Sequence, residues 1–97
     1  MNIQSYINTI AKCSRPAEGV TRLPFTNDHV AANKLLKRWM TDAGLKINLD
    51  AAGTLIGKYI SPIKNSKTLL IGSHQDSGYN SGRYDGIMGI ILPILAL

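Results

Sequence analysis

The last twelve residues of the chain, from 86 to 97, contain no polar side chain. They read Gly-Ile-Met-Gly-Ile-Ile-Leu-Pro-Ile-Leu-Ala-Leu. A helix that is apolar all round has to be buried all round, and Pro93 would kink this one or limit it to two short pieces. We therefore expect either that the chain is a piece of a larger protein or that this segment finds a partner.

Apolar periodicity predicts two further helices. Residues 2–13 carry apolar side chains at the spacing of one helical face, and residues 27–43 repeat them at intervals of three and four with polar residues opposite. Thr26 or the residue after it can cap the second helix, and Gly44 can end it. Residues 14–26, with two prolines and a glycine, are expected to form the connecting loop.

After the second helix the period changes to two, which indicates strands. Residues 45–49 alternate apolar and polar side chains, and residues 54–60 read as the returning strand of a hairpin in which Gly53 takes positive φ. Residues 61–66 are expected to be a surface loop. The apolar run 68–71 is typical of a strand covered on both faces. The order of these elements predicts an α/β fold.

Length and charge limit the classes of protein that fit. Ninety-seven residues make one small domain, and the composition is that of a globular protein rather than a disordered or fibrous one. The net charge of +5 could suit a nucleic acid, but the lysines and arginines are spread along the chain and accompany no nucleic-acid-binding motif. A solvated basic surface is the favoured interpretation, and nucleic-acid binding ranks third among the functional alternatives.

The compartment is indicated by the cysteine content and by the lengths of the apolar runs. The one cysteine, Cys13, excludes an intramolecular disulfide, is compatible with a reducing compartment, and is expected as a small buried hydrophobe. The N-terminus lacks the basic-then-apolar layout of a signal peptide. The apolar runs are too short to span a bilayer. We therefore expect a cytoplasmic protein with no membrane partner.

One histidine and two aspartates could carry chemistry: His74, Asp76 and Asp85, between the run 68–71 and the apolar terminal segment. Imidazole and carboxylate suit zinc, manganese or a similar divalent ion. Ligands bind at the carboxyl ends of strands in α/β proteins. Asp76 is well placed to accept the N–H of the His74 ring, and Asp85 would enter from the start of the final helix, whose N-terminus keeps a carboxylate ionised.

Each of these residues also has an ordinary structural interpretation. His74 could be a hydrogen-bonded histidine at a strand end, Asp76 could belong to a turn, and Asp85 could be a helix N-cap. The other histidine, His29, is expected as a partly exposed residue in the first turn of a helix and not as a ligand. Spacing alone leaves both interpretations open, because it is less specific than a paired Cys-x-x-Cys site.

Several separated stretches occur in an order that resembles a known family. They are residues 18–26 (Glu-Gly-Val-Thr-Arg-Leu-Pro-Phe-Thr), 39–45 (Trp-Met-Thr-Asp-Ala-Gly-Leu), 50–57 (Asp-Ala-Ala-Gly-Thr-Leu-Ile-Gly), 72–76 (Gly-Ser-His-Gln-Asp) and 82–86 (Gly-Arg-Tyr-Asp-Gly). From about residue 15 onward, the chain is similar to the N-terminal part of the hydantoinase/carbamoylase branch of the M20 metallopeptidase-like family. That branch includes allantoate amidohydrolases, N-carbamoyl-amino-acid hydrolases, ureidoglycolate hydrolases and β-ureidopropionases.

The resemblance implies a fold, a site and a reaction. Residues 1–97 would be the N-terminal part of a mixed-sheet, three-layer, zinc-peptidase-like catalytic domain, without the lid or dimerisation domain. His74 falls on the first metal-binding histidine, Asp76 on the catalytic-site aspartate that supports it, and Asp85 on the carboxylate that bridges two zinc or manganese ions. The substrate would be a small ureido or carbamoyl compound, allantoate or an N-carbamoyl amino acid, hydrolysed at a C–N bond.

The chain departs from the family pattern at Gly78, Ser81 and Thr54, none of which removes a ligand. The resemblance places the general-base glutamate and the remaining ligands beyond residue 97, so at most two of the three or four protein ligands of a divalent site are present. We therefore expect one wall of a site and little activity from the chain alone. The alternative is a non-catalytic module that forms homo-oligomers through the apolar terminal helix.

Overall fold

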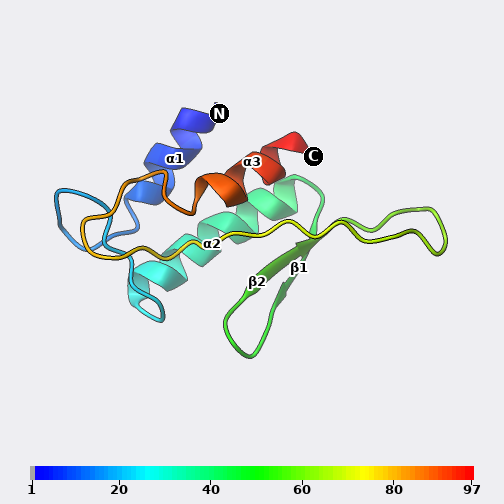
Figure 1. The fold of residues 1–97 in the computed structure, drawn as a ribbon, viewed down its shortest axis with the longest axis horizontal. Coiled ribbons are helices and arrows are strands. Elements are labelled where there is room, and N and C mark those ends of the chain that lie inside the picture. The colour runs from blue at the N-terminus through cyan, green and yellow to red at the C-terminus, as the bar shows by residue number, and fades with distance from the viewer. Residues whose placement is uncertain (1) are drawn as a thin grey trace.

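The computed structural model describes residues 2–97 and consists of three helices and one hairpin (Figure 1). In chain order the elements are α1 (Ile3–Ala11), α2 (Asn27–Asp42), β1 (Lys46–Leu49), β2 (Leu55–Lys58) and α3 (Met88–Ala96). This mixture of helices and strands confirms the α/β content that the sequence predicts.

The apolar faces of the three helices meet in a single core. Figure 1 shows α1 and α3 next to each other on one side of α2, so the first and last helices of the chain share this core. The ring of Tyr6 packs edge-on against Trp39, with 4.8 Å between the ring centroids. The buried apolar residues of the core are Ile7, Ile10, Ala32, Leu36, Trp39, Met40, Ile87, Ile91 and Ile94.

Local signals set the bounds of α2 and of the hairpin. The Thr26 side chain accepts a hydrogen bond from the His29 N–H at 3.3 Å, and Gly44 takes a φ of 88° just after the helix. The strands β1 and β2 are antiparallel, and Gly53 turns the chain between them with a φ of 86°. These predicted caps and turns are confirmed. Gly57 leaves room for Met40, because a Cβ there would lie 2.9 Å from the Met40 sulfur.

The run 68–71 does not form a strand, so the prediction of a strand covered on both faces is wrong for this structure. Leu69, Leu70 and Ile71 are 84%, 89% and 60% exposed, and their backbone makes no hydrogen bond within residues 2–97. A strand needs a partner that completes the hydrogen-bond ladder, and the sheet of the described residues pairs only β1 with β2. In Figure 1 the run belongs to the long extended segment that crosses α2.

The terminal apolar segment forms one helix, α3, with Pro93 inside it rather than two short pieces. One face is buried against the core through Ile87, Ile91 and Ile94. The opposite face is exposed, so the expectation of burial on every side is wrong, because α1 and α2 cover only one side of α3. None of the helices within residues 2–97 is long and apolar enough to cross a membrane.

Candidate functional site

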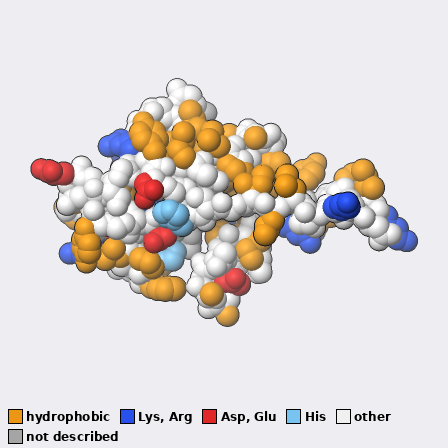
Figure 2. Space-filling view, viewed as in Figure 1, with side chains coloured by type: hydrophobic (Ala, Val, Ile, Leu, Met, Phe, Trp, Pro, Cys, Tyr) orange, Lys and Arg blue, Asp and Glu red, His pale blue; other side chains and the backbone are white. Residues whose placement is uncertain are grey.

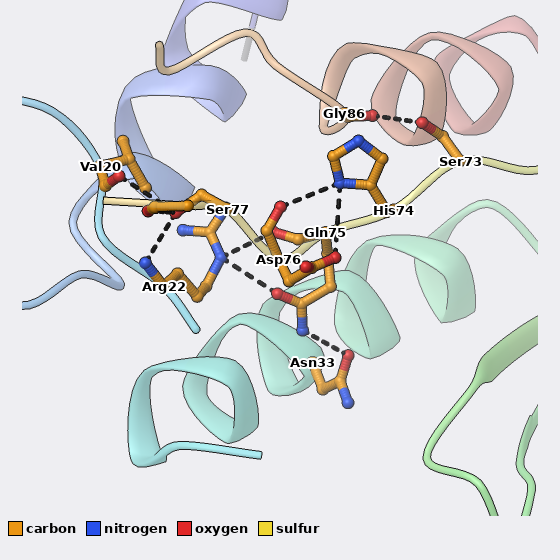
Figure 3. Close-up of polar contacts among 10 residues, drawn as sticks. Val20, Arg22, Asn33, Ser73, His74, Gln75, Asp76, Ser77 and Gly86 are labelled. Carbon is orange, nitrogen blue, oxygen red and sulfur yellow. Dashed lines mark hydrogen bonds and ion pairs between the residues drawn. The ribbon is translucent and has the colours of Figure 1, made fainter. Parts of the chain in front are cut away.

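His74 lies on the extended segment that crosses α2, with about half of its side chain exposed. Its ring Nδ1 is 3.0 Å from the main-chain oxygen of Asp76 and 3.4 Å from the Asp76 carboxylate (Figure 3). Both oxygens are acceptors, so a neutral ring satisfies them only with its proton on Nδ1. The lone pair then lies on Nε2, which makes no hydrogen bond to any of residues 2–97.

The turn that precedes the final helix approaches the His74 ring closely at a glycine. Gly86 has a φ of 73°, and a Cβ at this position would lie 2.6 Å from Nδ1 of His74. The Ser73 hydroxyl donates a hydrogen bond to the Gly86 carbonyl at 2.7 Å, which ties the two segments together beside the ring. The close approach therefore depends on the absence of a side chain at this position.

Asp85 precedes Gly86 and lies in a turn, not at the start of a helix. Helix α3 begins at Met88, its N-cap is Ile87, and no side chain caps it. The N-cap interpretation of Asp85 is therefore wrong, and so is the expectation that it enters from the start of the final helix, because a turn of chain separates it from the first helical residue. The Asp85 side chain is exposed, and its main-chain N–H donates to the Gly82 carbonyl at 3.2 Å.

The structure brings His74 and Asp76 together and places Asp85 next to the glycine that touches the histidine. Within residues 2–97 no three His, Cys, Asp or Glu side chains lie close enough to hold one ion. The donor set suits a divalent cation in kind, since it offers an imidazole nitrogen and carboxylates. Figure 2 shows histidine and acidic side chains gathered side by side on this face. These residues therefore fit one wall of a metal site.

The sequence gives little indication of the polar residues behind this wall. Arg22 is 2% exposed, and its Nε donates to the Gln75 carbonyl at 2.9 Å and to the Gln75 side-chain oxygen at 3.0 Å. The Gln75 amide donates to the His29 carbonyl and to Asn33 on α2. Ser77 exchanges hydrogen bonds with the Arg22 main chain. Arg22 lies within the first stretch of the family resemblance, which was the one available signal.

The remaining candidates take structural roles. His29 lies in the first turn of α2, partly exposed as expected, and its Nδ1 accepts a hydrogen bond from the Phe25 N–H at 2.7 Å. Cys13 is a free thiol, and burial raises its pKa above the ordinary value while the charge of Arg22 opposes that shift. A thiol with a raised pKa is a poor nucleophile at neutral pH. Cys13 is half-buried, so the prediction of a buried hydrophobe is confirmed only in part.

The chain is similar in sequence to amidohydrolases. It is 43% identical over 77 residues to an N-carbamoyl-L-amino acid amidohydrolase of Geobacillus stearothermophilus. The matched region covers 79% of this chain and 19% of that protein. It is 33% identical over 97 residues to an allantoate amidohydrolase of Bacillus subtilis, which covers 99% of this chain and 24% of that protein. No family model matches the chain.

A solved structure repeats the fold. A hydantoinase/carbamoylase family amidase from Burkholderia ambifaria superposes with a TM-score of 0.85 at 30% sequence identity, covering 94% of this chain and 23% of that one. The chain spans about a fifth to a quarter of the length of these relatives. Its helices, hairpin and extended segment therefore correspond to one part of a larger fold.

Proposed function

This chain is homologous to part of the amidohydrolases of the hydantoinase/carbamoylase family, and we propose that it supplies one wall of a metal site for hydrolysing ureido or carbamoyl C–N bonds. Its substrates would be allantoate or N-carbamoyl amino acids. The relatives that support this proposal are named for these two substrates. We propose further that residues 1–97 form part of the catalytic domain of a cytoplasmic enzyme.

The observation that carries the proposal is the orientation of the His74 ring. The main-chain oxygen and the carboxylate of Asp76 lie 3.0 and 3.4 Å from Nδ1 of His74, and Nε2 remains available to bind an ion. Metal-binding histidines are oriented in this way by an oxygen on the ring nitrogen that does not bind the ion. An ordinary surface histidine needs no such pair of acceptors.

Each residue then has a distinct task. The Nε2 lone pair of His74 would bind the ion, and Asp76 would hold the proton on Nδ1 and keep the ring in place. Asp85, beside Gly86, would supply the carboxylate between two ions. A bound divalent ion would polarise the substrate carbonyl and lower the pKa of a water molecule. Further ligands have to come from outside these residues, since two are fewer than a divalent site needs.

Metal binding tests the proposal without any need for turnover. Zinc or manganese titrated into the chain should bind weakly, with water molecules in place of the missing protein ligands, and His74→Asn should abolish that weak binding. Asp76→Asn should lower that affinity by roughly tenfold to a hundredfold, as removing such a supporting carboxylate does elsewhere. His29→Asn is the matched control and should bind like the unaltered chain. Binding that survives in His74→Asn, or no binding in any variant, contradicts the proposal.

The chain alone is expected to release no ammonia from allantoate or N-carbamoyl amino acids in the presence of manganese. The physical reason is that the two candidate ligands are fewer than a divalent site needs. Turnover well above that of His74→Asn would contradict this part of the proposal.

A second candidate function is self-association, and one observation favours it. Leu92, Leu95 and Leu97 are 48%, 40% and 65% exposed on or just after α3. Figure 2 shows further apolar side chains on the surface along the extended segment. Exposed apolar patches of several hundred Å² mark interaction sites. Light scattering should then show a dimer or a larger species. The double variant Leu92→Gln, Leu95→Gln should convert this species to a monomer. A monomeric unaltered chain at high concentration contradicts the proposal of self-association.

A further inference from the structure

Arg22 is a buried cation that is held by hydrogen bonds to neutral groups. Its side chain is almost fully enclosed, and no Asp or Glu of residues 2–97 forms an ion pair with it. Burial lowers the pKa of its guanidinium from the ordinary value. Enclosing a charge is costly unless hydrogen bonds replace the lost water. The position of Arg22 is therefore set by the groups that accept its hydrogen bonds.

Those acceptors belong to two separate segments. The Arg22 Nη1 donates to the carbonyls of Ile10 and Cys13 at 3.1 and 2.8 Å, at the end of α1, where the helix dipole favours a cation. The Nε donates to the carbonyl and the side-chain oxygen of Gln75. The guanidinium thus joins the end of α1 to the residue that stands between His74 and Asp76.

Side chains along this extended segment alternate between two sides. Gln75 and Ser77 point toward the protein, where Arg22, Asn33 and Val20 bind them. His74 is exposed and Asp76 is half-buried, and their side chains meet each other. Alternation is the ordinary property of extended backbone. Fixing one set of side chains therefore fixes the direction of the other set, and Figure 3 shows Gln75 held between Arg22 and Asn33.

We propose that Arg22 is a positioning residue: its hydrogen bonds to Gln75 hold His74 and Asp76 on the opposite side of the extended segment in the orientation that keeps Nε2 of His74 free for a metal ion. The role of the ion rests on the proposed function, whereas the orientation of the ring does not. A lysine cannot replace the arginine, because one ammonium group cannot reach the end of α1 and both Gln75 oxygens in the same planar arrangement.

Nitrogen-detected NMR of the histidine rings at pH 8 provides a readout that is independent of metal. In the unaltered chain His74 should be mainly protonated on Nδ1. In Arg22→Lys it should shift toward the Nε2-protonated form, and the affinity for zinc should fall by about tenfold or more. Arg38→Lys, on the exposed face of α2, is the matched control and should change neither quantity. Circular dichroism checks that each variant is folded.

A second variant decides the matter if Arg22→Lys does not fold. Gln75→Met keeps the carbonyl that Arg22 binds but removes the side-chain oxygen that Arg22 also binds, together with the links to Asn33 and to the His29 carbonyl. It should shift the tautomer of His74 in the same direction by a smaller amount. An unchanged tautomer in a folded Arg22→Lys, or in Gln75→Met when Arg22→Lys is unfolded, overturns the proposal.

The two proposals fail in different ways. If the unaltered chain binds no zinc but its His74 tautomer still depends on Arg22, the metal function is wrong and the positioning role stands. If zinc binds equally well to the unaltered chain and to a folded Arg22→Lys with the same tautomer, the positioning role is wrong and the metal function stands.

Discussion

At the scale of single residues, the contact between Gly86 and His74 is the tightest part of the site. An alanine would have to adopt a φ of 73° and would place its Cβ against the imidazole ring and the His74 carbonyl. Both effects act in the same direction, since a left-handed backbone is unfavourable for L-residues with a side chain and the contact is far below van der Waals distance.

Gly86→Ala should therefore lower the free energy of unfolding by about 1–3 kcal/mol and move the ring of His74. Urea unfolding measures the first effect and the histidine NMR signals measure the second. Gly72→Ala is the control, because a Cβ there meets nothing within 4 Å. Equal stability of the two variants would show that the turn before α3 does not press on the ring.

Cys13 gives a pH dependence at the same scale. Its pKa is raised by burial, so the folded state retains the thiol proton at a pH where the unfolded state loses it. The stabilising contribution is complete below the ordinary thiol pKa of ~8.5 and is lost as the pH rises through the raised value. The unfolding free energy should fall over this range by more in the unaltered chain than in Cys13→Ala. A difference that is constant with pH contradicts the expectation.

Among single residues, the sequence marked His74 and Asp76 as candidates but did not indicate that Arg22 and Gln75 contact each other beside them. Histidine and aspartate are recognisable because few other side chains bind metals. Arg22 and Gln75 are separated by fifty-two residues of chain, and their roles arise only when α1, α2 and the extended segment come together. No local pattern can indicate such a meeting. The helical environment expected for Asp85 also depended on where α3 begins, which the sequence did not specify.

At the scale of elements, local periodicity predicted the helices and the hairpin, because their backbone hydrogen bonds join residues that are close in the sequence. Helix α2 satisfies its own hydrogen bonds and has the predicted cap, and β1 and β2 pair with each other across a short turn. The run 68–71 is different, because a strand depends on a partner elsewhere in the chain. Apolar character indicated that this run would be buried, but it could not supply the second strand.

Hydrogen exchange tests this description of the run. The amides of Leu69, Leu70 and Ile71 have no hydrogen-bond acceptor within residues 2–97, so they should exchange at nearly the rates of an unfolded peptide. The amides of Ile10 and Leu36 lie in buried helical turns and should be protected. Protection of Leu70 comparable to that of Leu36 would mean that the run pairs with another strand in solution.

At the scale of the whole molecule, the core depends on contacts between the two ends of the chain. α1 packs against α3, and Ile91 is 1% exposed whereas its neighbour Leu92 is 48% exposed. Ile91→Ala should cost about 2–5 kcal/mol, the usual range for a buried isoleucine. Leu92→Ala on the open face should cost less than about 1 kcal/mol. Thermal unfolding of the two variants checks this, and equal losses would place α3 outside the core.

The loop 14–22 and the segment 75–81 are joined across the molecule by the Val20–Ser81 bridge and by the bonds between Arg22 and Ser77. The far loop at 61–67 has no comparable attachment to the body of the protein. A protease that cleaves there would leave two pieces, one on each side of the cut, still held together by the helical core and these bonds. The nicked protein would then behave as a non-covalent heterodimer, with Arg22 in one subunit and His74 in the other.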